Sequence, residues 1–372
     1  MRVYDGWDIG GVHLKRSRLV CGGGRPSLQT RIVPFEIWKD PSGLARRLRD
    51  LLGKDEEVEG GAASGRLGPP AIGGGLRSGR TMHGVTMTAE LSDVFPTRAE
   101  GVRTILGACA EVLPGPPRVL NLRGRLVTLD EALERPLEAA AANWMASAKL
   151  VALARREALL IDIGSTTTDI VPVRDGEPRP AGRTDTERLM AGELVYTGVL
   201  RTPPASLADR VPLAGGWCRV CPEHFTVMGD VYRVLGAMTE EEYTVPTPDG
   251  RGRSRNESMA RLARLVGADP ATIGPTAVET MAHFLQERQV DQVARAIVQV
   301  RALWPGDPPS EAIVAGAGSF LADCAARRAG LTPIRLDALF PRLGGDDWSR
   351  AAPSAALAVL LAAETGDYRF TS

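Results

Sequence analysis

The tripeptide Asp-Ile-Gly occurs twice in this chain, each time at the end of a segment with the pattern of a strand. The first copy starts at Asp8 and the second at Asp162, so the two are 154 positions apart, about the length of one domain. Apolar residues follow each copy in a pattern that predicts two strands joined by a glycine turn. A strand-loop-strand unit that recurs at this spacing predicts a duplicated α/β architecture with two related domains.

The rest of the chain reads as alternating strands and helices. Strands are predicted at 2–21 as a hairpin, 29–38, 81–89, 118–122, 158–173 as a second hairpin closed by Asp175 and Gly176, and from 312. Helices are predicted at 41–52, 97–113, 139–156, 230–235, 258–266, 276–303 and 352–364, and surface loops at 53–79 and 203–225. We therefore expect a first domain over residues 1–156 and a second over 157–372, with the alanine-rich final helix packing back on the first.

Composition narrows the class of ligand. With 372 residues, of which 44% are hydrophobic, the chain can bury the cores of two domains. Its 45 Lys and Arg balance its 45 Asp and Glu, so no global field favours nucleic acid or an acidic membrane surface. No signal-like segment or membrane-length apolar window is present. We expect a cytoplasmic protein that binds a small polar ligand, and a homodimer is one option for its assembly.

The five cysteines are scattered, which is typical of reduced thiols in a chain too large to need disulfides. Cys218 and Cys221, followed by His224, have the spacing of half a zinc site. No second cysteine pair or close histidine pair follows in the sequence to complete four ligands. A structural or incidental role therefore stands beside the metal-binding interpretation.

Each Asp-Ile-Gly loop has the chemistry of a phosphate site. Glycine turns tightly and brings backbone N–H groups close to an anion, and an aspartate at a strand end can hold hydrated Mg²⁺. One such tripeptide is also typical of an ordinary β-turn. The second copy, however, continues into hydroxyls and a carboxylate that a plain hairpin does not require: Ser165, Thr166, Thr167, Thr168 and Asp169. The pair of loops therefore predicts phosphate or magnesium handling.

A third glycine turn, formed by Gly316, Ala317 and Gly318, joins a strand-like run to a helix start. A turn of this kind offers a flat approach to a nucleobase or a phosphate. It is equally typical of close helix packing, and both interpretations stay open.

The order of first loop, second loop and late glycine turn resembles that of actin, sugar kinases and Hsp70 chaperones, along nearly the whole chain. This resemblance implies the two-domain actin-like ATPase fold, which is ribonuclease H-like. In that fold the duplicated phosphate-binding units face each other across a central cleft.

Longer strings resemble one family within this superfamily. They are Asp-Ile-Gly-Gly at 8–11 with Lys15, Thr-Met-Thr-Ala-Glu-Leu at 86–91, Arg-Ala-Glu-Gly-Val at 98–102, Asn-Trp at 143–144, Asp-Ile-Gly-Ser-Thr-Thr-Thr-Asp at 162–169, Gly-Glu-Leu-Val-Tyr-Thr-Gly at 192–198, Arg-Thr-Pro at 201–203 and Asp-Val-Tyr-Arg at 230–233. On these strings the chain is identified as a member of the hydantoinase/oxoprolinase-like family. It is similar to the group that contains the ether synthases of methanofuran biosynthesis, linked to tetrahydromethanopterin-dependent one-carbon transfer.

The resemblance implies a reaction and a set of residue roles. Enzymes of this group join an aminomethyl-furanmethyl diphosphate to the phenol of a γ-glutamyl tyramine or tyrosine acceptor. Pyrophosphate is released, and the product is the furan-phenol ether of methanofuran or methylofuran. The implied Mg²⁺ ligands are Asp8, Asp162 and Asp169. The implied substrate contacts are Gly10, Gly11, Lys15, Ser165, Thr166, Thr167, Thr168, Tyr196, Arg201, Gly316 and Gly318. The base that takes the phenol proton is either a buried carboxylate such as Glu193 or a lysine with a lowered pKa.

Other interpretations of the same residues remain. An ATP-dependent small-molecule kinase, or an amidohydrolase of the hydantoinase or oxoprolinase type, has the same loops and would bind adenine at the late glycine turn. A non-catalytic, nucleotide-gated protein of the actin or chaperone kind has them too. Locally, three plainer interpretations compete: a core segment at Leu194 to Tyr196 with a satisfied tyrosine hydroxyl, a surface pair of Asp185 and Arg188, and a helix ion pair of Asp230 and Arg233.

Overall fold

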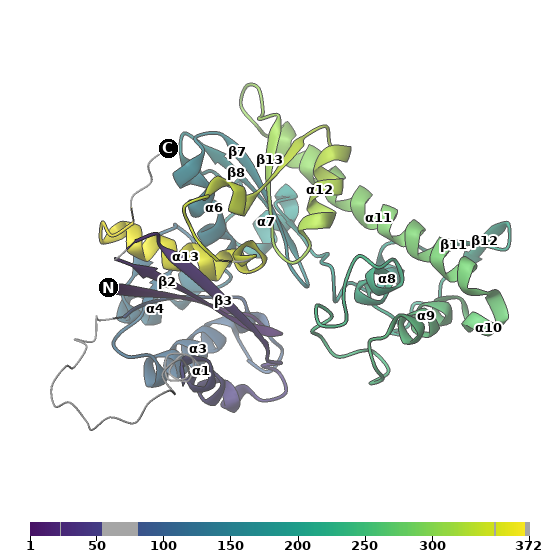
Figure 1. The fold of residues 1–372 in the computed structure, drawn as a ribbon, viewed down its shortest axis with the longest axis horizontal. Helices are drawn as coiled ribbons and strands as arrows, with labels where there is room; N and C mark the ends of the chain where they lie inside the picture. Colours follow the sequence, from purple (N-terminus) through teal and green to yellow (C-terminus); the bar gives the residue numbers. More distant parts are fainter. Residues whose placement is uncertain (23, 54–80, 346, 369–372) are drawn as a thin grey trace, which may run out of the picture. The chain divides into compact units, whose positions relative to one another are not determined.

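The computed structural model describes residues 1–22, 24–53, 81–345 and 347–368 (Figure 1). The surface loop expected at 53–79 lies outside the described residues beyond Gly53. The chain divides into two compact units, one of residues 1–150 with 340–372 and the other of residues 151–339. Within the described residues, no helix combines the length and the apolar character that crossing a membrane requires.

The first unit contains a six-stranded sheet in the order β3-β2-β1-β4-β5-β6. Its strands are β1 (Arg2–Ile9), β2 (His13–Cys21), β3 (Ser27–Pro34), β4 (Met82–Met87), β5 (Arg118–Leu120) and β6 (Leu126–Val127). Its helices are η1 (Pro41–Gly43), α1 (Leu44–Gly53), η2 (Ala89–Leu91), α3 (Arg98–Val112), α4 (Leu129–Glu134), α5 (Pro136–Ala139), η6 (Trp348–Ala351) and α13 (Ala352–Glu364), and α6 (Asn143–Ala154) starts here. Strand β1 is antiparallel to β2 and parallel to β4, which places the end of β1 inside the sheet.

Helix α13 packs directly on β1, β2 and β4. Its residues from Ala352 to Val359 are all buried, and Gly6 of β1 lies against the backbone of Ser354 and Ala358. Ser354 Oγ also lies 2.8 Å from Ser17 Oγ of β2. Small side chains thus allow the close packing expected of this alanine-rich helix.

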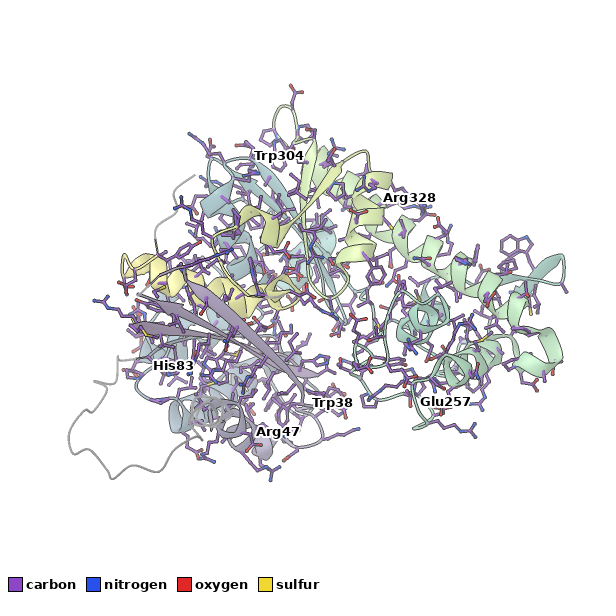
Figure 2. The ribbon with its side chains drawn as sticks, in the orientation of Figure 1. Trp38, Arg47, His83, Glu257, Trp304 and Arg328 are labelled. Carbon is purple, nitrogen blue, oxygen red and sulfur yellow. The ribbon has the colours of Figure 1, made fainter. Side chains whose placement is uncertain are left out.

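A buried charged cluster joins β1, β2 and β4. Asp5 is fully buried and pairs with Arg16 at 2.8 Å and with Arg18 at 2.9 Å. His83 (Figure 2) is also buried, and its Nδ1 accepts a hydrogen bond from Trp7 Nε1 at 3.3 Å. Burial lowers the pKa of His83 to about 4, although the charge of Asp5 acts in the opposite direction. The native state therefore favours a neutral imidazole.

This histidine should make stability depend on pH. Because the pKa of His83 is lower in the native state than the ordinary 6.5, the unfolded chain binds the proton more tightly. The contribution of His83 to the free energy of unfolding is therefore fully present above pH 6.5 and is lost as the pH falls toward about 4. Between pH 7 and pH 4.5 we expect the free energy of unfolding to fall by about 2 kcal/mol less in the His83→Gln variant than in the parent. Urea unfolding at pH 7 and pH 4.5 measures the difference, and equal losses in the two proteins would contradict it.

The second unit repeats the strand arrangement of the first. Its main sheet has the order β10-β8-β7-β13-β14, and β9 pairs with β8. The strands are β7 (Ala158–Ile163), β8 (Thr168–Arg174), β9 (Glu177–Pro178), β10 (Leu194–Val195), β13 (Glu311–Ala315) and β14 (Thr332–Arg335). Strand β7 is antiparallel to β8 and parallel to β13, just as β1 is to β2 and β4. The duplicated strand-loop-strand unit predicted from the repeated tripeptide is therefore confirmed.

The other elements of the second unit surround this sheet and a separate hairpin. The hairpin consists of β11 (Arg210–Leu213) and β12 (Gly216–Arg219), and β11 packs beside the long helix α11 (Pro275–Ala302). The further helices are α7 (Asp185–Ala191), η3 (Pro204–Ser206), α8 (Met228–Val234), α9 (Arg255–Ala263), η4 (Arg264–Val266), α10 (Pro270–Ile273), α12 (Ser319–Arg328) and η5 (Leu336–Leu339).

The surface loop expected at 203–225 is wrong, because this segment contains η3 and the hairpin of β11 and β12. Several predicted boundaries also differ from the observed ones, three of them for clear local reasons. The strand expected to reach 38 ends at Pro34, after which Phe35 and Ile37 donate to the backbone of the first loop instead. The helix expected from 139 starts at Asn143, because Ala141 has a φ of 48° that interrupts the turn. The helix expected from 258 starts at Arg255, behind a capping box of Ser254 and Glu257.

Candidate functional site

The first loop follows a buried carboxylate near the end of β1. Asp8 lies opposite Lys15 on β2 and Thr86 on β4. Lys15 Nζ is 2.8 Å from Asp8 Oδ2, whereas Asp8 Oδ1 and Thr86 Oγ1 are buried and have no hydrogen-bond partner among the described residues. Buried polar atoms are nearly always satisfied by protein, water or a bound group. These two oxygen atoms therefore mark a place where a bound ion or ligand can form the interactions that the protein does not supply.

The backbone after Asp8 is held while one side of it stays open. Gly10 N donates to His13 O at 3.0 Å, and Gly11 O accepts from Ile37 N at 3.2 Å. No atom lies within 4 Å of the position that a Cβ on Gly11 would take. A ligand can therefore approach the backbone of Gly11 closely.

The second loop has two carboxylates in register but in different electrostatic settings. Asp162 on β7 lies opposite Asp169 on β8, and both are buried. Asp169 Oδ1 pairs with Nη1 of the buried Arg188 at 2.9 Å. The proposed surface pair of Arg188 with Asp185 is therefore wrong, because the arginine turns inward from α7 to compensate Asp169. Asp162 has the position in β7 that Asp8 has in β1, so it is the corresponding candidate for a metal ligand in the second loop.

The late glycine turn lies directly against this loop. Gly316 has a φ of 87°, and a Cβ there would come within 2.4 Å of Asp162 Oδ1. Gly318 N donates to Ile163 O at 2.8 Å. Close packing thus requires glycine at this turn, and the turn forms one wall around Asp162.

The hydroxyl residues of the second loop separate into two groups. Ser165, Thr166 and Thr167 are half-buried in a turn that is closed by a hydrogen bond from Gly164 N to Thr167 O at 2.9 Å. Thr168 is fully buried, and its hydroxyl donates to Thr197 O at 2.7 Å. The first three side chains are therefore the candidates for ligand contact, and Thr168 supports the loop.

The segment after β10 holds the second loop from behind. Val199 N donates to Gly164 O at 3.1 Å, and the N–H groups of Leu200 and Arg201 donate to Ser165 O at 3.1 and 3.0 Å. A Cβ on Gly198 would lie 2.5 Å from Thr166 N. The supporting backbone thus touches the loop backbone without a side chain between them.

A buried amide fixes this supporting segment. Gln289 of α11 donates from Nε2 to Thr197 Oγ1 at 2.8 Å and to Gly198 O at 2.9 Å. Its Oε1 accepts from Tyr232 OH of α8 at 2.6 Å, and Thr202 Oγ1 accepts from Gly198 N at 2.8 Å. Sequence reasoning missed Gln289. The available signal was a polar residue midway between Leu285 and Val293 on the buried stripe of a helix.

Glu193 lies in a structural position beside the site. Its two carboxylate oxygens accept from Ala181 N at 2.6 Å and Gly182 N at 3.0 Å, and burial raises its pKa. Its carbonyl oxygen accepts from Arg188 Nη2 at 3.0 Å, which helps to aim that arginine at Asp169. Tyr196 is 59% exposed, so the interpretation of this tyrosine as a core residue is wrong.

The structure also tests two hypotheses about residues outside the two loops. Asp230 does not pair with Arg233 but with the fully buried Arg261 at 2.7 Å, which joins α8 to α9. Arg233 pairs with Glu240 at 3.4 Å instead.

Cys218 is on β12 and Cys221 follows it, and both are free thiols. In the described part of the chain, no group of three or more His, Cys, Asp or Glu side chains is arranged to hold a metal ion.

Comparisons with known proteins identify relatives along most of the chain. The family model described as hydantoinase/oxoprolinase matches residues 81–340. A (4-{4-[2-(gamma-L-glutamylamino)ethyl]phenoxymethyl}furan-2-yl)methanamine synthase of Methanocaldococcus jannaschii is 32% identical over 278 residues, which cover 74% of this chain and 81% of that protein. A synthase of the same name from Methanococcus vannielii is 39% identical over 114 residues, covering 31% of this chain and 51% of that protein.

Solved structures support the fold. Nucleotide-free acetone carboxylase matches with a TM-score of 0.53 and 12% sequence identity, over 96% of this chain and 70% of the other. Together with the repeated sheet topology, this likeness confirms the two-domain actin-like α/β fold that the order of the loops predicted.

Proposed function

The chain belongs to the hydantoinase/oxoprolinase family, and from this premise we propose that it is an enzyme that forms an ether between a furanmethyl carbon and a phenol oxygen. The observation that carries the proposal is the 32% identity over 81% of a synthase whose name describes a phenoxymethyl-furan. The relatives are synthases rather than kinases, which favours ether formation over the ATP-dependent alternatives.

The proposed chemistry is a substitution at the furanmethyl carbon. The phenol oxygen forms a bond to this carbon, the bond from the carbon to the diphosphate oxygen breaks, and its electron pair leaves with the diphosphate. The phenol proton passes to the released diphosphate or to water. The protein must therefore stabilise departing negative charge and hold the phenol in line with the breaking bond.

The first loop contributes charge and backbone to this task. Lys15 supplies a cation beside Asp8, at 2.8 Å, and the open backbone of Gly11 offers an N–H donor to a phosphate oxygen. Lys15 is 23% exposed, so its ammonium is within reach of a ligand. These groups would bind the diphosphate and stabilise the negative charge that develops on it as it leaves.

The second loop contributes hydroxyls and a carboxylate. Ser165, Thr166 and Thr167 would donate to diphosphate oxygens from a turn that the backbone supports. We assign Glu193 to positioning of Arg188 rather than to proton transfer, because both of its carboxylate oxygens already accept backbone N–H groups.

The residues fit Mg²⁺ as a cofactor. Magnesium is usually held by one or two carboxylates together with water and substrate phosphates, rather than by a complete protein cage. The unsatisfied Oδ1 of Asp8 suits that role in the first loop, and Asp162 suits it in the second. When bound, the ion would neutralise charge on the diphosphate.

The proposal is tested by mixing the purified protein with Mg²⁺, the aminomethyl-furanmethyl diphosphate and a γ-glutamyl-tyramine acceptor. We expect pyrophosphate and a product with the mass of the ether to appear in equal amounts. Omission of the phenol should remove the ether. An absence of ether, combined with steady ATP hydrolysis in the presence of a small substrate, would overturn the proposal in favour of an ATP-dependent enzyme.

A further inference from the structure

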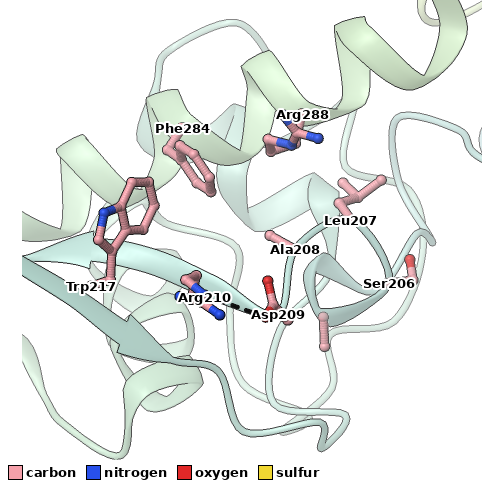
Figure 3. A pocket seen from close by; sticks show the side chains of 9 residues that line it. Ser206, Leu207, Ala208, Asp209, Arg210, Trp217, Phe284 and Arg288 are labelled. Atoms are coloured by element: carbon pink, nitrogen blue, oxygen red, sulfur yellow. Dashed lines mark hydrogen bonds and ion pairs between the residues drawn. The ribbon is translucent and has the colours of Figure 1, made fainter. Parts of the chain in front are cut away.

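The second unit contains a pocket that the proposed reaction does not use. It has a volume of about 540 Å³ and lies between α11 and the segment that runs from η3 into β11 and β12 (Figure 3). This volume is within the range of small-molecule sites, about 300–1,000 Å³. None of the described residues that line the pocket belongs to the two Asp-Ile-Gly loops or to the late glycine turn. A molecule bound here would therefore occupy a site of its own.

One wall of the pocket is aromatic. Trp217 of β12 is 61% exposed, and the centroid of its ring lies 5.3 Å from that of Phe284 of α11 in an edge arrangement. Tryptophan is usually more buried, because its large apolar surface gains from removal from water. The two rings therefore offer an apolar surface against which the ring of a ligand can pack.

The pocket also contains a cation that can bind an anion, Arg288 of α11. Its Nη1 lies 3.3 Å from Asp291 Oδ2, whereas the other oxygen of the same carboxylate lies 2.7 Å from Nη1 of Arg328. Asp291 is therefore held more closely by Arg328 than by Arg288. A guanidinium has about five N–H donors, so this single long contact leaves Arg288 with donors for a further anion.

The helix sets the distance between the aromatic and the cationic group. Phe284 and Arg288 are four positions apart on α11, so both lie on the same face of the helix, with about 5–6 Å between their Cβ atoms. In an arylpropionate, two methylene groups separate the ring from the carboxylate over a distance of the same order. A ligand of this length can therefore reach both groups at once.

The charge of the lining favours a ligand with a single negative charge. The charged lining residues are Arg210, Arg288 and Asp209, and Arg210 Nε lies 3.3 Å from Asp209 Oδ2. One positive charge thus remains after this pair is counted. A phosphate monoester carries a charge of roughly −1.5 to −2 at neutral pH, which exceeds what the lining balances. A carboxylate carries one negative charge, and its two oxygens match the paired donors of a guanidinium.

We infer that this pocket is a second ligand site, which takes a small aromatic monocarboxylate of the arylpropionate type. The ring of the ligand packs against Trp217 and Phe284, and its carboxylate accepts hydrogen bonds from Arg288. The inference does not rest on the proposed function, because no residue of the pocket has a role in ether formation.

The test measures binding of 3-phenylpropionate to the full chain by isothermal titration calorimetry. Two further probes each lack one group, since 3-phenylpropanol has no carboxylate and propionate has no ring. We expect saturable binding of 3-phenylpropionate at one site, with a Kd at least about tenfold below that of either probe. A lack of saturable binding, or equal affinity for 3-phenylpropanol, would overturn the inference.

Variants show whether this binding occurs in the pocket. Arg288→Met keeps an unbranched apolar side chain and removes the charge, so it should raise the Kd for 3-phenylpropionate at least about tenfold without changing that for 3-phenylpropanol. Trp217→Ala should also raise the Kd for 3-phenylpropionate. The control is Arg219→Met, on β12 opposite Arg210 and outside the pocket lining, which should bind as the parent does. An equal loss in the control would show a general charge effect and overturn the inference.

A competition experiment separates the pocket from the phosphate loops. Inorganic pyrophosphate with Mg²⁺ is a probe for the loops, and we expect it to leave the Kd for 3-phenylpropionate unchanged. If pyrophosphate displaces 3-phenylpropionate, the carboxylate binds at the loops and the inference of a second site is wrong.

Discussion

Ether formation is expected to fall at least about 100-fold in Asp162→Asn, and equally in Asp8→Asn. Asparagine keeps the shape of each buried side chain and removes the charge. In the first loop this charge faces Lys15 and leaves one carboxylate oxygen unsatisfied. In the second it lies beside the late glycine turn. The measurement is the rate of pyrophosphate release at saturating substrates, together with thermal unfolding of each variant.

The matched control is Asp175→Asn, at the opposite end of the hairpin that carries Asp162. Asp175 is exposed, sits 3.5 Å from Arg156 and has a φ of 55°, which asparagine tolerates. This variant should keep full activity. Retained activity in both Asp8→Asn and Asp162→Asn would refute the assignment of these carboxylates to diphosphate and magnesium.

The second large effect is expected from Gly198→Ala, which should lower kcat roughly 100-fold although no side chain of the site is changed. The added Cβ would lie 2.5 Å from Thr166 N and from the carbonyl carbon of Ser165. Both are backbone atoms that cannot rotate away, so the second loop must shift. A displacement of about 1 Å in a positioning element can cost about two orders of magnitude in rate. The loss of stability should stay near 1–3 kcal/mol, as for other overpacked sites.

Gly216→Ala is the control for this substitution. The nearest atom to a Cβ on Gly216, Leu213 O, is 3.9 Å away, so the residue accepts a methyl group without displacement. Its activity should equal that of the parent.

If Gly198→Ala unfolds instead, a substitution at Gln289 tests the same supporting segment without adding an atom to its backbone contact. In Gln289→Glu the anion loses the donor to Thr197 and Gly198, and kcat should again fall while Kd for the acceptor stays constant.

The segment that supports the second loop is held by buried polar side chains that hydrogen-bond to one another, rather than by apolar packing. Tyr232, Gln289, Thr197 and Thr202 each have a partner, and all four are buried. Such networks specify one backbone arrangement because any slippage leaves a buried polar group unpaired. This property suits a loop whose hydroxyls must stay in place while charge develops on a ligand.

Local pattern was enough to predict most elements near the site. The apolar run before Asp162 and the glycine after it predicted a hairpin, and the structure has β7 and β8 joined at that turn. The Asp175-Gly176 pair also forms a hairpin turn, but this turn joins β8 to β9. Strand alternation and turn residues act over a few positions, so a single sequence carries them. The repeat after 154 positions predicted the second copy of the same sheet order in the same way.

The partners of charged residues could not be predicted, because they depend on which surfaces the fold brings together. Arg188 had a nearby acidic neighbour in Asp185, yet its side chain is buried and pairs with Asp169 of β8. Asp230 had Arg233 on its own helix, yet it pairs with Arg261, whose helix α9 packs on α8. A buried charge requires a close partner whatever its distance in sequence. Spacing along the chain therefore suggested the wrong partner in both cases.

The sequence by itself determined the two Asp-Ile-Gly loops, their strands and the family, since glycine turns and apolar periodicity are local properties. Only the tertiary structure decided what surrounds each loop: the unsatisfied oxygen of Asp8 between β2 and β4, and the contact of Gly198 with Thr166. It also decided the role of Gln289, which in the sequence is one polar residue of a long helix. The reason is physical, because burial and close contact arise only when distant segments pack.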